Sequence, residues 1–396
     1  MRGATGVSSR RVFLWMVCAV LPLSASGAPA AIEAPSQGDG SADPGTMEPV
    51  QSSCHGDAAK ADGILFLSRR PGGARDDNYD IYRAELDGSN VRRVTDLSEV
   101  SIRWFDKDPV RDRLVVAGSS DGDLSIGPSG KHGGASSGEQ FIAIVEPGEP
   151  LHLLIDIRSD SLNSERFIGV WHPTFAPDGK RIVFSGSKRG ESANLWMVNS
   201  DGTDLRRLID DPRRTYNDPR FGPNGKVVFV RHDAMGMAQL LQANNLDVWI
   251  LDPDRPGSAQ RVTPEDSIPG PATIDTDPAM SPDCRWVASV RASQPLSPRS
   301  LLRPASDNVV FGIGDDNPGQ YDRLQHGENP LRVHGVPTWQ DSSTLLSYRW
   351  DTTGKGWRII RYRLDSQDND VEVMDLGAPI GGEDLLPLAY SQPGRR

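Results

Sequence analysis

The sequence predicts an all-β fold made of repeated, four-stranded antiparallel sheets. The 396 residues include 40 Gly and 31 Pro, a density of turn-forming residues that excludes long helical bundles and coiled coils. A phrase with the pattern Pro-x-aromatic-x-Pro-Asp/Asn-Gly recurs along the chain, in whole or in part. A second phrase, in which a short apolar run leads to a Gly-containing turn and an Arg-bearing segment, follows it. Together the two phrases indicate a unit of four strands.

The spacing of the first phrase indicates how these units are arranged. Its copies begin at Pro173, Pro219, Pro278 and, in a degenerate form, Pro337. The starts are 46, 59 and 59 residues apart. This spacing matches one four-stranded blade of a β-propeller with loops of variable length. The sequence therefore predicts a β-propeller.

Each phrase specifies its strands and turns in order. The Pro-x-aromatic opening predicts a first strand, and Pro177, Asp178 and Gly179 predict a tight hairpin turn. The β-branched and aromatic residues 182–184 predict the second strand. Residues 194–208 then predict a third strand, an Asp-Gly turn and an exposed fourth strand, which complete one blade.

The number of blades follows from the two ends of the repeat region. The first unit starts directly with its second strand at 64–67, and the second unit is divergent and extends over 103–154. The C-terminal residues 387–394 repeat the spacing of a first strand. The sequence thus predicts six blades, closed by pairing of the C-terminal strand with the N-terminal blade, which leaves no open sheet edge. The four remaining units are expected to begin near Trp171, Asn217, Asp275 and Gly335.

The phrases at 177–180, 194–197 and 201–208 resemble the WD40-like repeat of the TolB propeller family. The resemblance covers roughly residues 63–391 and implies a six-bladed β-propeller. It implies no single activity, because such propellers serve as protein-binding modules, as sugar-processing lyases and as appendages of serine peptidases.

The N-terminal region indicates export. Residues 1–30 are typical of a signal peptide, with arginines before an apolar run at 12–23 and small residues after it. Residues 9–14 resemble a twin-arginine signal, and this route and ordinary secretion both remain open. Residues 31–62 predict a flexible linker, 63–391 the propeller and 392–396 a tail. We expect a periplasmic or secreted protein whose mature form has no transmembrane segment.

Charge and loop lengths indicate the kind of partner. The net charge of −11 argues against binding to nucleic acid, which requires clustered Lys and Arg. Long insertions at 119–139, 233–245 and 292–308 all join second strands to third strands, so they lie on one face of the propeller. We predict that this insertion-bearing face of a monomeric protein binds a protein or another envelope component.

The residues just before the recurring prolines are candidate binding residues. His172, Asp218 and Asp277 are expected at the mouth of the central channel, with Arg103 and Arg220 supplying compensating positive charge. Two interpretations remain open: these side chains hold a divalent cation, or they cap the starts of strands. No other cofactor is predicted. The favoured function is non-catalytic binding, and the alternative is a metal-assisted carbohydrate lyase or hydrolase at the channel mouth.

Two cysteines remain after removal of the signal peptide. Cys54 and Cys284 form either one disulfide, as an oxidising compartment favours, or two free thiols. Cys284 occupies the turn position that Gly179 holds in an earlier blade. A disulfide between these two cysteines would fasten the linker to the hairpin that contains Cys284.

Overall fold

The computed structural model describes sixteen stretches of the chain. They are residues 54, 63–69, 79–97, 100–120, 140–159, 166–211, 214–233, 245–263, 273–293, 306–313, 321–323, 333–334, 336–351, 356–364, 371–375 and 388–391. The expected signal peptide, the linker apart from Cys54, the tail and most of each insertion lie outside the described residues.

The described elements are β-strands, and the first three sheets contain four antiparallel strands each. The first sheet has the order β25 (Leu388–Ser391), β1 (Gly63–Arg69), β2 (Tyr79–Ala84) and β3 (Arg92–Arg93). The second contains β4 (Val100–Lys107), β5 (Leu114–Ser120), β6 (Phe141–Val145) and β7 (His152–Asp156). The third contains β8 (Phe167–Phe175), β9 (Arg181–Lys188), β10 (Asn194–Asn199) and β11 (Arg206–Arg207).

The next sheet has eight strands and divides into two antiparallel groups. The first group contains β12 (Arg214–Phe221), β13 (Val227–Asp233), β14 (Asn245–Asp252) and β15 (Arg255–Arg261). The second contains β16 (Thr273–Met280), β17 (Trp286–Ser293), β18 (Ser306–Gly312) and β19 (Tyr321–Arg323). A short parallel pairing of β14 with β16, Asn245 with Thr273 and Leu246 with Ile274, joins the groups.

The last sheet has five strands. It contains β20 (Val333–His334), β21 (Thr338–Asp341), β22 (Thr344–Asp351), β23 (Gly356–Arg363) and β24 (Val371–Asp375), and both β20 and β21 pair with β22. The predictions of an all-β fold and of four-stranded antiparallel sheets are therefore confirmed.

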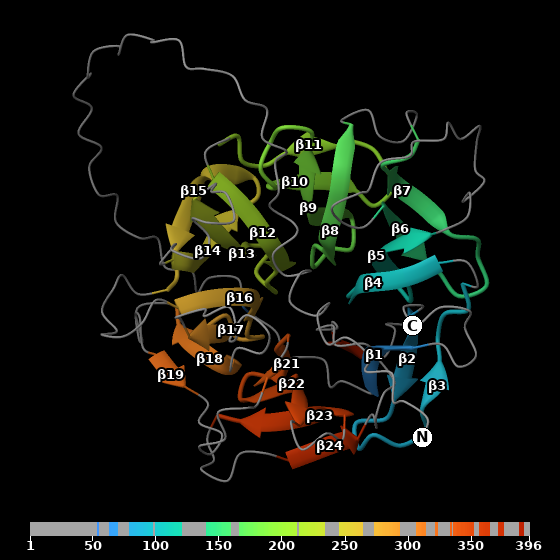
Figure 1. Cartoon of the computed structure of the whole chain (residues 1–396), viewed down its shortest axis with the longest axis vertical. Coiled ribbons are helices and arrows are strands. Elements are labelled where there is room, and N and C mark those ends of the chain that lie inside the picture. Colours follow the sequence, from blue (N-terminus) through green and yellow to red (C-terminus); the bar gives the residue numbers. More distant parts are fainter. Residues whose placement is uncertain are drawn as a thin grey trace, which may run out of the picture.

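The sheets follow one another in chain order around a common centre (Figure 1). The strands β4, β8, β12 and β16 lie nearest that centre. Turns between first and second strands, such as that joining β8 to β9, lie at one end of the sheets, which we call the hairpin face. The turn between β9 and β10, which joins a second strand to a third strand, lies at the opposite end, which we call the insertion-bearing face.

The hydrophobic core lies between neighbouring sheets. One buried cluster joins Ile64 and Phe66 of the first sheet to Phe105 and Val116 of the second, and others join the following sheets. Burying one large apolar side chain contributes about 1.5–3 kcal/mol, so these clusters hold the sheets against one another. Rings that are fully buried include those of Phe66, Phe141, Phe184, Phe229 and Phe311.

The two ends of the repeat region meet in the first sheet. β25 pairs with β1 in antiparallel register, from Gly63 with Ser391 to Phe66 with Leu388. The last sheet also contacts the first sheet, because Arg361 Nη2 donates a 2.7 Å hydrogen bond to the Leu86 carbonyl. Leu346, Tyr348 and Ile359 of the last sheet are part of the cluster that contains Ile64 and Phe66.

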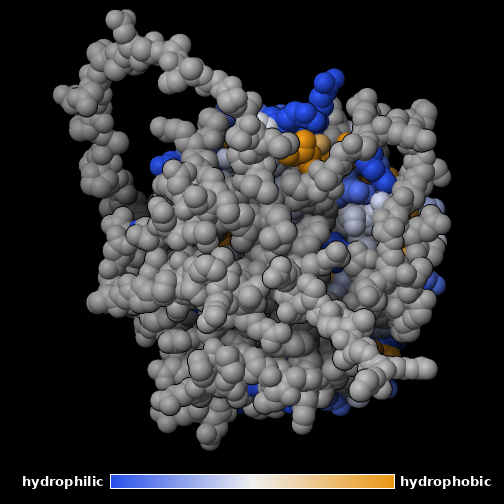
Figure 2. All heavy atoms as spheres, in the orientation of Figure 1, coloured by the Kyte–Doolittle hydropathy of each residue, from blue (hydrophilic) through white to orange (hydrophobic). Residues whose placement is uncertain are grey.

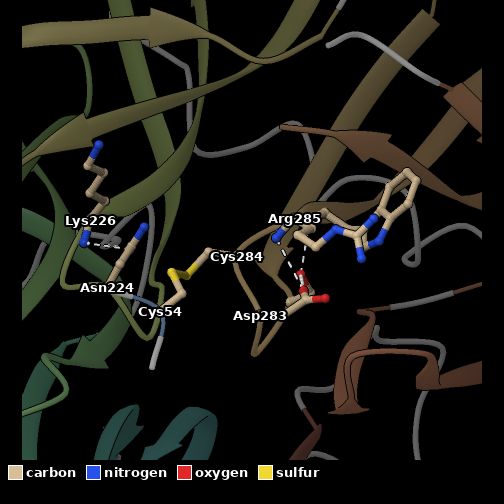
Figure 3. The surroundings of a disulfide bond; sticks show 8 residues. Cys54, Asn224, Lys226, Asp283, Cys284 and Arg285 are labelled. Atoms are coloured by element: carbon tan, nitrogen blue, oxygen red, sulfur yellow. Dashed lines mark hydrogen bonds between the residues drawn. A yellow bond between two sulfur atoms is a disulfide. The ribbon is translucent and has the colours of Figure 1, made fainter. Parts of the chain in front are cut away.

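A disulfide joins Cys54 to Cys284 across a sequence separation of 230 residues (Figure 3). Cys284 lies in the hairpin between β16 and β17 and has a φ of 57°. Cys54 packs against an apolar cluster that includes Met280 and Phe311. The bond therefore fastens the chain that precedes the propeller to the hairpin face.

The described surface is mainly polar. On the face drawn in Figure 2 the described residues are mostly hydrophilic, with small hydrophobic areas. The large apolar side chains that are exposed are those of Val91, Val94 and Val110. In the described part of the chain, no helix is long and apolar enough to span a membrane.

Candidate functional site

The first strands of four consecutive strand groups, β4, β8, β12 and β16, each lead into a hairpin, and these hairpins allow equivalent residues to be matched. Each hairpin is closed by a backbone hydrogen bond, such as that from Ala176 N to Arg181 O. The equivalent donors are Asp108, Gly222 and Ser281. Four residues before each donor lie Trp104, His172, Asp218 and Asp277, which we call the inner tier. Two residues before each donor lie Asp106, Thr174, Arg220 and Ala279, which we call the hairpin tier.

Three members of the inner tier have the same unusual backbone. His172, Asp218 and Asp277 have φ values of 50°, 51° and 51°. Each lies at a β-bulge, where its own strand (β8, β12 or β16) has one more residue than the strand it pairs with. A proline follows each of them and donates no hydrogen bond to the ladder. Because positive φ costs a non-glycine residue about 1–2 kcal/mol, the bulges are held by the surrounding sheets.

The bulges lie further inside the strands than the sequence predicts. The interpretation that His172, Asp218 and Asp277 cap the starts of strands is wrong, because each strand begins several residues earlier. Residues 167–171 extend β8 toward the N-terminus, and Phe167 pairs with Lys188 near the end of β9. β12 and β16 likewise begin at Arg214 and Thr273. The inner tier therefore lies within the strands.

Contacts within the inner tier run from sheet to sheet. The Trp104 and His172 rings have centroids 4.3 Å apart. His172 Nδ1 lies 2.7 Å from Asp218 Oδ1, and the backbone N–H of Asp277 donates to the Asp218 carboxylate. One series of contacts thus connects β4, β8, β12 and β16.

The hairpin tier forms a second series of contacts. Asp106 Oδ2 accepts hydrogen bonds from Thr174 Oγ1 at 3.0 Å and from Phe175 N at 2.9 Å. Thr174 Oγ1 in turn accepts a 3.3 Å bond from Phe221 N. Arg220 Nη1 donates a 2.8 Å bond to the carbonyl of Pro337, which immediately precedes β21. Polar contacts therefore cross the centre at this level too.

The two carboxyl groups of the inner tier have opposite pKa shifts. Burial raises the pKa of Asp277 to about 6, and the neighbouring Asp218 carboxylate adds to the shift, whereas His172 and Arg220 oppose it. Burial also disfavours the charged form of Asp218, but His172 and the Asp277 N–H outweigh it and lower the pKa of Asp218. Asp218 therefore stays ionised to a lower pH than Asp277 does.

Burial also acts on the charged groups of the hairpin tier. It raises the pKa of Asp106, although the Phe175 N–H and the Arg220 charge oppose the shift. Burial lowers the pKa of Arg220, and the carboxylates of Asp106, Asp277 and Asp218 oppose that shift. The guanidinium charge of Arg220 therefore acts on carboxylates of both tiers.

The structure brings together four of the five predicted binding residues. His172, Asp218, Asp277 and Arg220 interact as described above. Arg103 instead lies with its Cζ 5.4 Å from the centroid of the Tyr79 ring, so it faces the first sheet. The expectation that Arg103 compensates the central carboxylates is not supported by this placement.

The candidate metal ligands His172, Asp218 and Asp277 lie on three first strands that follow one another in the chain, β8, β12 and β16. Among the residues that the structure describes, no group of three His, Cys, Asp or Glu side chains is arranged to hold an ion. His172 Nδ1 lies 2.7 Å from an Asp218 oxygen, so these two candidate ligands contact each other directly.

Sequence reasoning missed Trp104, Asp106 and Thr174. The repeat was aligned on its prolines, and the second sheet has Phe105 where the others have proline. Counting back from the hairpin at 108–113 would have placed Trp104 beside His172 and Asp106 beside Thr174. The position of this hairpin in the sequence was therefore the signal that could have identified these three residues.

Comparison with known proteins places this geometry in a known fold. The structure of TolB from Acinetobacter baumannii superposes with a TM-score of 0.54 and 15% identity, covering 82% of this chain and 65% of that one. The chain has a TolB-like β-propeller fold. Hydrazine synthase from Kuenenia stuttgartiensis matches with a TM-score of 0.58 and 14% identity, over 85% of this chain and 47% of that one. At these identities the likeness shows the fold alone.

Sequence comparison adds one short match. An uncharacterized protein of Agrobacterium fabrum is 40% identical over 65 residues, which is 16% of this chain and 21% of that protein. No family model matches the chain. Each of the three proteins named here is matched over less than two thirds of its own length.

Proposed function

We propose that this TolB-like propeller is an exported, non-catalytic binding module that engages a protein or another envelope component. Its site is the inner tier, approached from the insertion-bearing face. The observation that carries the proposal is the continuous contact series from Trp104 through His172 and Asp218 to Asp277, which joins side chains of four strand groups around one centre. Convergent polar groups on rigid strands are typical of a recognition site.

The scaffold of this site is proposed to be a ring of six blades closed by β25. Pairing of β25 with β1 supports closure, and the Arg361 bond to Leu86 ties the last sheet to the first. The eight-stranded sheet counts as two blades, because its two groups share only a two-residue parallel pairing. Buried clusters between consecutive groups also support the ring.

Export is proposed from the N-terminal sequence. Residues 1–30 have the features of a signal peptide, and residues 31–62 those of a linker. The Cys54–Cys284 disulfide is consistent with an oxidising compartment, where such bonds persist. We therefore place the mature protein, as a monomer, in the periplasm or outside the cell.

Site-specific photocrosslinking in native cells tests the binding role. Arg189 is exposed in the turn between β9 and β10 on the insertion-bearing face, and Lys180 is exposed in the hairpin between β8 and β9 on the opposite face. A photoreactive residue at 189 should capture one envelope component, while the same residue at 180 should not. Equal capture at both positions, or none at 189, would contradict the proposal.

A further inference from the structure

Arg220 connects two groups of strands that are not neighbours in the chain order. It lies on β12, and its Nη1 bonds to the carbonyl of Pro337, beside β21 of the last sheet. The group β16–β19 lies between these two groups in the chain order (Figure 1). The side chain therefore reaches past β16 and across the centre.

The rest of the hairpin tier completes this connection. Asp106 of β4 accepts from Thr174 of β8, and Thr174 accepts from Phe221 N of β12. Together with the Arg220 bond, these contacts link the second, third, fourth and last sheet groups at one level. The Arg220 guanidinium also lies 6.0 Å from the centroid of the Trp104 ring, so it contacts the inner tier from the hairpin side.

Solvent exposure is similar in the two tiers. Thr174 is 3% exposed and Ala279 is 2% exposed in the hairpin tier, and Trp104 is 7% exposed and Asp277 is 8% exposed in the inner tier. The other two members of each tier are half-buried. The hairpin tier is therefore distinguished by the Arg220 bond across the centre and not by its exposure.

We propose that Arg220 is a brace that spans the centre of the propeller at the hairpin tier, so that a partner reaches the inner tier from the insertion-bearing face. This inference rests on the proposed function, because it assigns the direction of approach to that site. A half-buried arginine suits the task, since it stays charged and its planar group can bond a carbonyl while stacking near an indole.

Hydrogen exchange of the full chain tests the brace without a partner. Two amides report directly on the hairpin tier: Phe175 N–H, which bonds to Asp106, and Phe221 N–H, which bonds to Thr174. In Arg220→Ala these amides should exchange about tenfold faster or more, the effect of losing one hydrogen bond to a charged group. Arg220→Met, which keeps most of the volume, should show the same change if the alanine variant does not fold.

Arg361→Ala is the matched control, because it removes an equivalent arginine–carbonyl bond at Leu86, away from the centre. It should leave exchange at Phe175 and Phe221 unchanged. Unaltered exchange at both amides in the Arg220 variants would overturn the brace. If position 189 captures nothing in the otherwise wild-type protein while the Arg220 variants show accelerated exchange, the proposed function is contradicted and the brace is not.

Discussion

His172 Nδ1 lies 2.7 Å from Asp218 Oδ1, and the two residues occupy equivalent bulges on the first strands of neighbouring sheets. The contact joins β8 to β12 at the centre of the fold. Asp218→Asn should remove its charge while keeping its shape, and we expect a loss of about 1–3 kcal/mol in the free energy of unfolding. Urea denaturation measures this loss. Asp178→Asn, at an exposed hairpin position, is the control and should change stability little.

Stability should depend on pH through Asp277. The pKa of Asp277 is raised to about 6 in the folded protein, against about 3.9 for an unfolded Asp. The folded state therefore holds the proton more tightly, so the contribution of Asp277 is complete below about pH 4 and is lost as the pH rises through about 6. The lowered pKa of Asp218 acts in the opposite sense, in a more acidic range.

Between about pH 5 and pH 8, Asp277 should increase the equilibrium constant for unfolding about tenfold. Asp277→Asn should lack this component, and Asp178→Asn should retain it. Denaturation curves at the two pH values measure the difference. Identical pH dependence in the wild type and in Asp277→Asn would show that Asp277 does not titrate in this range.

The hairpin glycines allow steric and backbone effects to be separated. Gly179 has a φ of 66°, and a Cβ there would lie 2.5 Å from Asp108 Oδ1, whose carboxyl group is paired with Arg113. Gly225 has a φ of 75°, but a Cβ there would meet nothing within 4 Å. Gly225→Ala should cost about 1–2 kcal/mol from the backbone alone, and Gly179→Ala should cost more. Equal losses of stability would argue against close packing of Asp108 on this turn.

The disulfide should stabilise the propeller. Closing a loop of 230 residues contributes up to about 5 kcal/mol, so Cys54→Ser should lower the melting temperature. Mass spectrometry of the unreduced mature protein should show no alkylatable thiol. Two alkylated cysteines, or a variant as stable as the wild type under oxidising conditions, would contradict this account.

The repeated phrase made part of the site predictable. His172, Asp218 and Asp277 share one backbone conformation because each precedes a proline in the same phrase, and the turns after them carry their own sequence signals. The upstream halves of the strands carry no comparable signal, so their starts were placed too late. The bond from Arg220 to the Pro337 carbonyl could not be predicted, because any residue supplies a backbone carbonyl and only the tertiary fold selects one.

The direction of the Arg103 side chain could not be predicted from the sequence either. Arg103 and Trp104 are consecutive residues of β4, and from the sequence alone either side chain could face the centre. Packing decides between them: Trp104 contacts His172, while Arg103 lies against Tyr79. Which of two neighbouring side chains faces the next sheet depends on the position of the bulge, because a shift of one residue turns every side chain to the opposite face.

The central claim is that β25 completes the first sheet and so holds the ring that carries the site. Thermal unfolding of a chain ending at residue 387, compared with one ending at 391, tests it most directly, since the shorter chain lacks the four residues that pair with Gly63 to Phe66. We predict a melting temperature lower by many degrees, or loss of cooperative unfolding, in the shorter chain alone. Equal melting temperatures for the two chains would contradict the closed ring.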